Sequence, residues 1–551
     1  MGNSTPNGQF IRVRMYNSGS DAIVHLHRTD MKHRRTIALL FTLLVPAASH
    51  AQGLAAPVRP AFDVTETTIA DVHAAMRAGT LTCRELVTAY VHRIAAYDKN
   101  GPALNALILV NPAALAVADS LDRRFATGGL VGPLHCVPVI VKDNFETNDL
   151  QTTAGSLSLQ GMIPKQDAFM VKRIREAGAI VLAKANMAEF AFTPYETVSS
   201  ILPGYTRNPY ALDRVTAGSS GGSAAAIAAN LGEVALGTDT GNSIRGPSAH
   251  QALVGIRSTM GLTSRDGIAP LNLASDIAGP IARTVADAVA VFQVVAGEDA
   301  ADSVTARSRG HRVADYTSAL KRDALKGARI GVLHQAYDRD TADPEVLRVF
   351  SSALNDMRAQ GATIVDPVAV AGLEQKLRNA GGCNPFKWEI NDWLARQGDR
   401  APVHTLAEVI ASRRYHPSIQ ARLESAQADT IPPSRNPGCA SRDAFRAWLR
   451  TGVTAVMDSL KLDALVYPTW SNPPRLIGDL NTPHGDNSQL FSPSTGFPAI
   501  TVPMGYTRGQ LPAGLQLLGR AWAEPTLIAL AYSFEQATHY RHPPASTLPL
   551  R

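Results

Sequence analysis

Apolar residues recur at helical spacing near the start of the first regular part of the chain. From Thr68 to Ile94 they fall at three- and four-residue steps, which predicts two helices separated by Gly79. A third predicted helix follows Pro112 and extends to Arg124. These helices should form a layer that packs on another element.

Two continuous apolar runs predict buried strands. Val137–Val141 is followed directly by Lys142, and Ala179–Ala183 is followed directly by Lys184. Such runs are typical of strands that are covered on both faces. The amphipathic segment Asp167–Ala177 lies between them and predicts a helix, so the alternation indicates an α/β layered domain.

The rest of the chain continues this alternation without an internal repeat or a low-complexity tract. Residues 370–450 are more polar and should form a cover over the sheet. Helices are predicted over residues 223–230, 284–295, 344–360 and 527–536, and strands over 234–238, 326–333, 362–365, 465–468 and 499–503.

The net charge of +6 is concentrated near the N-terminus. Residues 1–51 hold six Lys or Arg against two Asp, so they account for four of these net charges. The remainder is close to neutral, which removes the main support for a nucleic-acid-binding function.

Residues 31–51 have the pattern of a secretory signal peptide. Met31 begins a basic stretch, the apolar run Thr36–Val45 follows, and small residues precede a cleavage site after Ala51. The apolar run is too short to cross about 30 Å of hydrocarbon, so we expect cleaved export to the periplasm or medium and no stable membrane anchor. Residues 1–30 lack periodicity and are interpreted as an upstream extension before the true start at Met31.

Four cysteines are compatible with disulfides in an oxidising compartment. Cys383 and Cys439 both lie in surroundings rich in Gly and Pro and are the favoured pair, with Cys83 and Cys136 remaining. Four buried thiols stay an equal alternative, because sequence alone does not decide the pairing. No Cys-x-x-Cys or His-Glu-x-x-His spacing indicates a metal site.

Ser219 and Ser243 stand in glycine-rich turns, where backbone N–H groups can approach a ligand closely. A phosphate-binding loop is disfavoured, because no Gly-Lys-Ser/Thr follows and residues 212–215 do not resemble a good strand. The missing strand also weakens an α/β-hydrolase interpretation, in which Ser220 of Gly-x-Ser-x-Gly would be the nucleophile.

A third interpretation uses the lysine at the end of the first buried strand. A serine hydroxyl is a poor nucleophile until a base removes its proton, and burial can lower the pKa of a lysine enough for this task. Lys142, Ser219 and Ser243 would then act as base, relay and nucleophile.

Several motifs in this order resemble the amidase signature family. They are Val-Pro-Val-Ile-Val-Lys-Asp at 137–143, Gly-Ser-Ser-Gly-Gly-Ser at 218–223, Leu-Gly-Thr-Asp-Thr-Gly-Asn-Ser-Ile-Arg at 236–245 and Gly-Phe-Pro-Ala-Ile-Thr-Val-Pro at 496–503. The resemblance implies one large α/β/α layered domain over residues 52–551, with a central mixed, mostly parallel sheet. Residues 370–450 would be a variable cover over the active site.

The resemblance also implies hydrolysis of a carboxylic amide by a Ser–cis-Ser–Lys triad, without a cofactor or metal. Matched by motif, Ser243 is the nucleophile, Ser219 the relay on a cis peptide and Lys142 the base. The backbone N–H groups of Thr240, Gly241, Asn242 and Ser243 would form the oxyanion hole. Phe192 and Tyr195 follow the segment that lines the family's acyl pocket, and both substrate contact and core packing stay open for them.

Some positions depart from the family pattern. Asn242 stands where the family usually has glycine, so its side chain should narrow the site or donate a hydrogen bond to substrate. Residues 255–259, Gly-Ile-Arg-Ser-Thr, replace Gly-Leu-Lys-Pro-Thr and are interpreted as structural drift. Supporting roles are expected for nearby residues: Asp239 and Arg245 as an ion pair, Ser220 and Ser223 as turn and cap, and Lys184 in a surface or structural position.

Together these inferences predict an exported amidase that acts on a small-molecule amide and binds no nucleic acid, with a homodimer left open. An esterase-leaning acylase on the same triad is one alternative. The glutaminase subunit of a tRNA-dependent amidotransferase is another, which the signal peptide disfavours because charged tRNA is cytosolic. A degenerate binding protein is disfavoured by the intact Lys142, Ser219 and Ser243.

The signal peptide predicts the mature N-terminus. In a bacterial host that exports the protein, the periplasmic or secreted form should begin at Gln52, because signal peptidase cuts after small residues such as Ala51. N-terminal sequencing measures this. An Ala51→Leu variant should keep its leader, and a wild-type mature form that retains Met31 would contradict the prediction.

Overall fold

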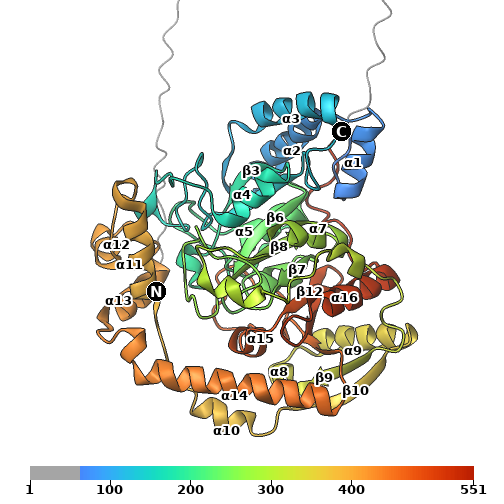
Figure 1. Ribbon diagram of the computed structural model, residues 1–551, viewed down its shortest axis with the longest axis vertical. Helices are drawn as coiled ribbons and strands as arrows, with labels where there is room; N and C mark the ends of the chain where they lie inside the picture. The colour runs from blue at the N-terminus through green and yellow to red at the C-terminus, as the bar shows by residue number, and fades with distance from the viewer. Residues whose placement is uncertain (1–61, 551) are drawn as a thin grey trace, which may run out of the picture. The chain divides into compact units, whose positions relative to one another are not determined.

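The computed structural model describes residues 62–550, so the predicted signal peptide (31–51) and upstream extension (1–30) lie outside the described residues. The described part is built around an 11-stranded sheet (Figure 1). Its strands are β1 (Leu107–Val110), β2 (Pro138–Lys142), β3 (Ile180–Ala185), β6 (Val234–Asp239), β7 (Val254–Arg257), β8 (Ile277–Ala282), β9 (Arg329–Leu333), β10 (Thr363–Val368), β11 (Ala464–Pro468), β12 (Ala499–Thr507) and β13 (Leu511–Leu518).

The strands follow the order β1-β3-β2-β6-β8-β7-β12-β13-β11-β9-β10. The expected α/β class and mixed sheet are confirmed. The expectation of a mostly parallel sheet is wrong, because only the ladders β3–β2–β6 and β11–β9–β10 are parallel. The other ladders of the described sheet are antiparallel, and the β12–β13 connection, 508–510, is far too short for a parallel crossover.

Helices pack on both faces of this sheet (Figure 1). Threonine caps begin four of the described helices, with Thr68, Thr82, Thr284 and Thr405 each accepting a backbone N–H of the first turn. None of the helices within residues 62–550 is long and apolar enough to cross a membrane. The helices are α1 (Ile69–Arg77), α2 (Cys83–Tyr97), α3 (Ala114–Gly128), α4 (Phe169–Glu176), α5 (Gly221–Ala228), α6 (Arg245–Ala249), α7 (Val285–Val295), α8 (His334–Tyr337), α9 (Pro344–Ala359), α10 (Leu373–Arg378), α11 (Phe386–Gln397), α12 (Leu406–Ser412), α13 (Gln420–Ala428), α14 (Pro437–Ser459), α15 (Phe491–Thr495) and α16 (Glu524–Thr538).

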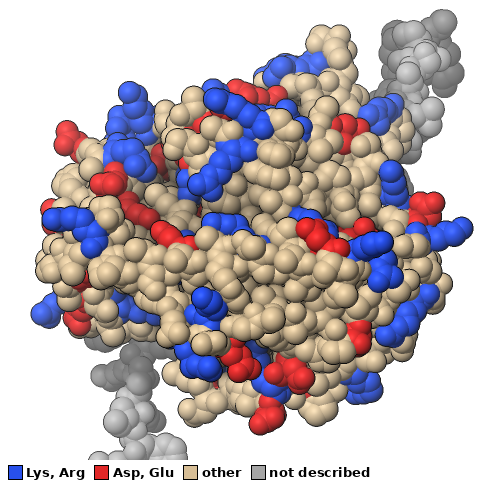
Figure 2. Space-filling model, turned by 60° about the horizontal axis from the view of Figure 1, so that its bottom comes forward, with Lys and Arg blue, Asp and Glu red and all other residues tan. Residues whose placement is uncertain are grey.

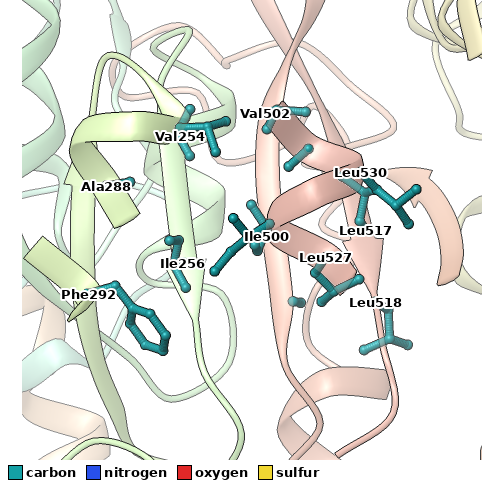
Figure 3. Packing of buried hydrophobic residues seen from close by; sticks show 14 of the residues in the cluster. Val254, Ile256, Ala288, Phe292, Ile500, Val502, Leu517, Leu518, Leu527 and Leu530 are labelled. Atoms are coloured by element: carbon teal, nitrogen blue, oxygen red, sulfur yellow. The ribbon is translucent and has the colours of Figure 1, made fainter. Parts of the chain in front are cut away.

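The largest core lies between the middle of the sheet and the helices α7 and α16 (Figure 3). Val254 and Ile256 of β7 are two residues apart, so both side chains point to the same face, where Phe292 of α7 packs. Ile500 of β12 and Leu527 of α16 continue this layer. Burying such side chains stabilises the fold by about 1.5–3 kcal/mol each, and the sheet is therefore a firm base for the loops at its edge.

Two smaller cores attach the remaining helices. The predicted N-terminal layer is confirmed, because α2 and α3 bury apolar side chains in one cluster with α5 and with Ile140 of β2. Helices α11, α12 and α13 share another cluster with Phe190 and Phe192 of the loop after β3. Residues 370–450 therefore pack beside a loop in which the sequence placed candidate substrate contacts.

Two disulfides tie these layers together. Cys383 pairs with Cys439, as favoured from the sequence, and joins the segment before α11 to α14. Cys83 pairs with Cys136 and joins the start of α2 to the residues before β2. The alternative of four buried thiols is therefore not the state described.

Residues 211–215, which include the segment judged a poor strand, form β5 (Ala211–Val215). This strand pairs with β4 (Arg207–Asn208) in a separate two-stranded sheet of the described chain and forms one isolated bridge, from Arg214 to Leu476. The sequence expectation was wrong about the strand itself. The turn before α5 nevertheless does not follow a strand of the large sheet, as an α/β-hydrolase elbow would require.

Candidate active site

Lys142 ends β2 and hydrogen-bonds two hydroxyl groups. Its Nζ lies 2.8 Å from Ser219 Oγ and 2.8 Å from Thr238 Oγ1. Thr238 belongs to β6, which pairs in parallel with β2, so the carboxyl ends of both strands meet at one edge of the sheet. Lys142 is fully buried, and this burial lowers its pKa to about 7, although Asp239 and Asp276 oppose the shift.

Ser219 lies in the turn that precedes α5. The Gly218–Ser219 peptide is cis, as the family resemblance implies. Gly218 packs against the carbonyl oxygens of Thr193 and Glu196, which leave no room for a Cβ atom. Glycine is therefore required at this position, and the surrounding backbone holds the turn that presents Ser219 to Lys142.

Ser243 lies in the turn after β6, which is braced by a buried ion cluster. Asp239 Oδ2 is 3.0 Å from Arg245 Nε, and Asp239 Oδ1 is 3.0 Å from Arg257 Nη1. Burial opposes ionisation of this carboxyl, but Arg245 and Arg257 bring its pKa down to about 2. The expected Asp239–Arg245 pair is confirmed, and the interpretation of residue 257 as drift is wrong, because Arg257 supplies the second half of the brace.

The backbone N–H groups of residues 240–243 have no hydrogen-bond partner within the described part of the chain. Neighbouring groups fix the turn around them. Arg245 Nη2 donates to Gly241 O over 2.6 Å, and Thr240 Oγ1 donates to Asp276 Oδ1 over 2.5 Å. The turn thus keeps free donors in a fixed conformation, as an oxyanion hole requires.

The Asn242 side chain does not face the substrate space, contrary to the sequence expectation. It is fully buried, and its Nδ2 donates to Asp486 Oδ2 over 2.8 Å. Asp486 also accepts hydrogen bonds from Gln489 Nε2 at 2.7 Å and from the backbone N–H of Ser488 at 2.9 Å. The Asn242 side chain therefore supports the turn on the side away from the cavity. It neither narrows the cavity nor is placed to hydrogen-bond a ligand there.

A cavity of about 480 Å³ opens beside Ser243 and is also lined by Thr240 and Gly241. Phe192 and Tyr195 line it as well, and Phe192 packs edge-on against Phe386 of α11, with ring centroids 4.6 Å apart. Phe192 therefore belongs to both the cavity wall and a core. Lys142 and Ser219 are fully buried and are not among the lining residues.

The supporting residues have structural roles, with two corrections. Ser220 Oγ donates to Thr238 O and Ser223 Oγ to Leu236 O, so both side chains tie α5 to β6. Ser220 stands at the N-cap position of α5, but its side chain makes no cap hydrogen bond. Lys184 is fully buried, which excludes the surface position. Its Nζ donates to Phe145 O at 2.7 Å and lies 3.8 Å from Asp143 Oδ1.

Sequence reasoning missed Thr238, Arg257 and three arginines of the cavity wall, Arg422, Arg442 and Arg446. Thr238 could have been found, because a polar residue in an otherwise apolar strand needs a partner. The arginines carry no such signal. Within the described residues, Cys83, Asp122 and Cys136 form one group close enough to hold a metal, but its two sulfurs are bonded to each other.

Comparisons with known proteins place this chain in a family. The model of the family named Amidase matches residues 85–528. A probable amidase of Arabidopsis thaliana is 33% identical over 88% of this chain and 92% of its own length. A subunit of the glutamyl-tRNA(Gln) amidotransferase of Moorella thermoacetica is 34% identical over 84% of this chain and 94% of its own length.

Solved structures agree with this result. The peptide amidase of Stenotrophomonas maltophilia is 39% identical, with a TM-score of 0.78 over 88% of this chain and 99% of that protein. The chain therefore belongs to the amidase signature family, and it is a hydrolase that acts on amide bonds.

The ion cluster under the Ser243 turn predicts a large stability effect. An Asp239→Asn variant should lose about 3–5 kcal/mol of unfolding free energy, because two buried guanidinium groups lose their charge partner. Urea unfolding measures this loss. The matched control is Glu298→Gln, which breaks an exposed ion pair with Arg309 and should leave the unfolding free energy nearly unchanged. Equal stability of the two variants would show that the cluster does not brace the turn.

Proposed function

We propose that the protein hydrolyses a carboxylic amide through an acyl-enzyme, with Ser243 as nucleophile, Ser219 as relay and Lys142 as base. The observation that carries this proposal is the hydrogen bond between Ser219 and a fully buried lysine whose pKa is about 7. A lysine in this state is partly neutral at physiological pH, so it can accept a proton from a hydroxyl group.

The reaction begins when Lys142 accepts the proton of Ser219 and Ser219 accepts that of Ser243. The Ser243 oxygen attacks the amide carbon, and the backbone N–H groups of residues 240–243 stabilise the resulting oxyanion, each by a few kcal/mol. When the C–N bond breaks, the proton returns through Ser219 to the departing amine. Water then attacks the Ser243 ester, the proton path runs again, and the carboxylic acid leaves.

A peptide amide is the substrate class that we favour. The similarity to a peptide amidase, at 39% identity over nearly its whole length, supports this class. Two alternatives use the same residues: an ester substrate, and glutamine, which the similarity to a component of an amidotransferase supports. Hydrolysis rates distinguish the three substrate classes. They are measured on a peptide amide, on the matching methyl ester, and on glutamine with and without charged tRNA. The proposal fails if only tRNA-dependent glutamine hydrolysis is found.

We also propose that the protein is exported to the periplasm or the medium. The signal-peptide pattern of residues 31–51 supports export, and so do the two disulfides, because reducing cytosol disfavours such bonds. Figure 2 shows basic and acidic side chains interspersed over one face of the molecule.

Substitution of the triad tests the proposed chemistry. Ser243→Ala should abolish hydrolysis of a generic aryl amide, and Lys142→Ala should lower kcat by several orders of magnitude, because the nucleophile then lacks its base. Steady-state rates measure both effects. Ser220→Ala is the matched control, since this serine stands next to Ser219 but its hydroxyl group, among the described residues, hydrogen-bonds to the backbone of Thr238. Full activity of Ser243→Ala rules out the triad, and loss in Ser220→Ala alone would favour the α/β-hydrolase interpretation.

The lowered pKa of Lys142 predicts the pH dependence of catalysis. Only neutral Lys142 is a base, so kcat/KM should rise with pH and level off above an apparent pKa of about 7. Asp276→Asn removes a negative charge that raises the pKa of Lys142, so the rising limb should move to lower pH. A pH profile that is flat from 5 to 9 would contradict the role of Lys142.

A further inference from the structure

Three arginines from α13 and α14 line the cavity beside Ser243. They are Arg422, Arg442 and Arg446, and the described residues that line this cavity include no Asp or Glu. Arg422 Nη1 donates to the carbonyl oxygen of Phe192, which fixes one guanidinium in the wall. The cavity thus carries an excess of positive charge close to the site of the proposed reaction.

The other two guanidinium groups are bonded mainly to neutral acceptors. Arg446 Nη1 donates to Ala274 O over 3.3 Å, and Arg446 Nη2 donates to Ser275 Oγ. Its ion-pair partner Asp443 is 3.8 Å away and its side chain is 69% exposed, so the pair is weak and screened. The charge of Arg446 is therefore largely uncompensated.

Arg442 lies one helical turn before Arg446 on α14. Its Nη1 donates to Cys383 O over 2.7 Å, while its Nε is buried and has no hydrogen-bond partner among the described residues. Burial, and next the neighbouring Arg442, lower the pKa of Arg446 to about 10, which still leaves it charged at neutral pH. The neighbouring Glu389 compensates these charges only in part, because burial raises its pKa to about 7.

A second cavity adjoins the first at Arg446. It has a volume of about 570 Å³ and shares Arg446, Pro493 and Ser494 with the cavity beside Ser243. Arg307 and Arg450 add two further positive charges to its wall and Asp443 adds one negative charge, so the wall keeps a net positive charge. An extended substrate bound at Ser243 can therefore continue past Arg446, and a negative group along it would meet this wall.

We propose that Arg442 and Arg446 form a subsite for a carboxylate of the substrate, so that the preferred substrate is an acidic peptide amide. This inference rests on the proposed amidase function. The planar guanidinium group matches a carboxylate with two parallel hydrogen bonds, and such charge-assisted bonds are about twice as strong as neutral ones. The carboxylate would lie away from the scissile amide, and the subsite would select substrates without taking part in the chemistry.

Binding to an inactive variant tests the subsite independently of hydrolysis. The ligands are short alanine peptide amides with one Glu or one Gln, placed at each position in turn. Each peptide is titrated into the Ser243→Ala protein, and calorimetry measures its affinity. At one position the Glu peptide should bind about 10- to 100-fold more tightly than its Gln partner. Adding Arg442→Gln and Arg446→Gln should reduce this ratio to about one while Gln-peptide affinity changes little.

A matched control distinguishes a local carboxylate subsite from a general effect of the protein's positive charge. Arg348→Gln with Arg358→Gln removes two exposed arginines of α9 and should leave the Glu/Gln ratio unchanged. A ratio near one at every position in the Ser243→Ala protein overturns the subsite, and this result stands even if the arginine variants fail to fold. If the Glu peptides bind preferentially but the wild-type protein hydrolyses none of the peptide amides, the subsite is supported and the peptide-amide function is rejected.

Discussion

The parallel pairing of β2 with β6 is the constraint on which the candidate site depends. Its register sets Val141 opposite Leu236, so the next residues of both strands emerge together at one edge of the sheet. Lys142 meets Thr238 there, and the turn before α5 adds Ser219 from a third element. Because all three groups are anchored in buried backbone, little reorganisation is needed when substrate arrives.

The buried carboxylate at the end of β6 is paired with arginines and not with Lys142. Asp239 is the nearest strand-end carboxylate along β6, but two arginines hold it, and Lys142 makes no ion pair among those of the described residues. Burial therefore dominates its pKa. Lys184 shows the contrast: it lies 3.8 Å from Asp143, its pKa falls only to about 8, and its role is structural.

The sequence predicted the elements whose signals are local. Long apolar runs predicted β2 and β3 and drew attention to Lys142 at the end of β2, and glycine-rich motifs singled out Ser219 and Ser243 as candidates. It missed β8 and β13, which contain Gly and Pro and are strands only because distant partners pair with them. It also missed the arginine wall, since a helical pattern shows that α14 packs on the domain but not which cavity its polar face reaches.

The Asn242 position indicates where this enzyme differs from its relatives. Its side chain donates a hydrogen bond to Asp486 and does not line the cavity, so the departure from the family glycine affects the contacts that hold the Ser243 turn. Differences in substrate must then come from elements that reach the cavity from outside the sheet, and α13 and α14 do so. The Cys383–Cys439 bond joins α14 to the segment before α11, so it holds in place the helix that carries Arg442 and Arg446.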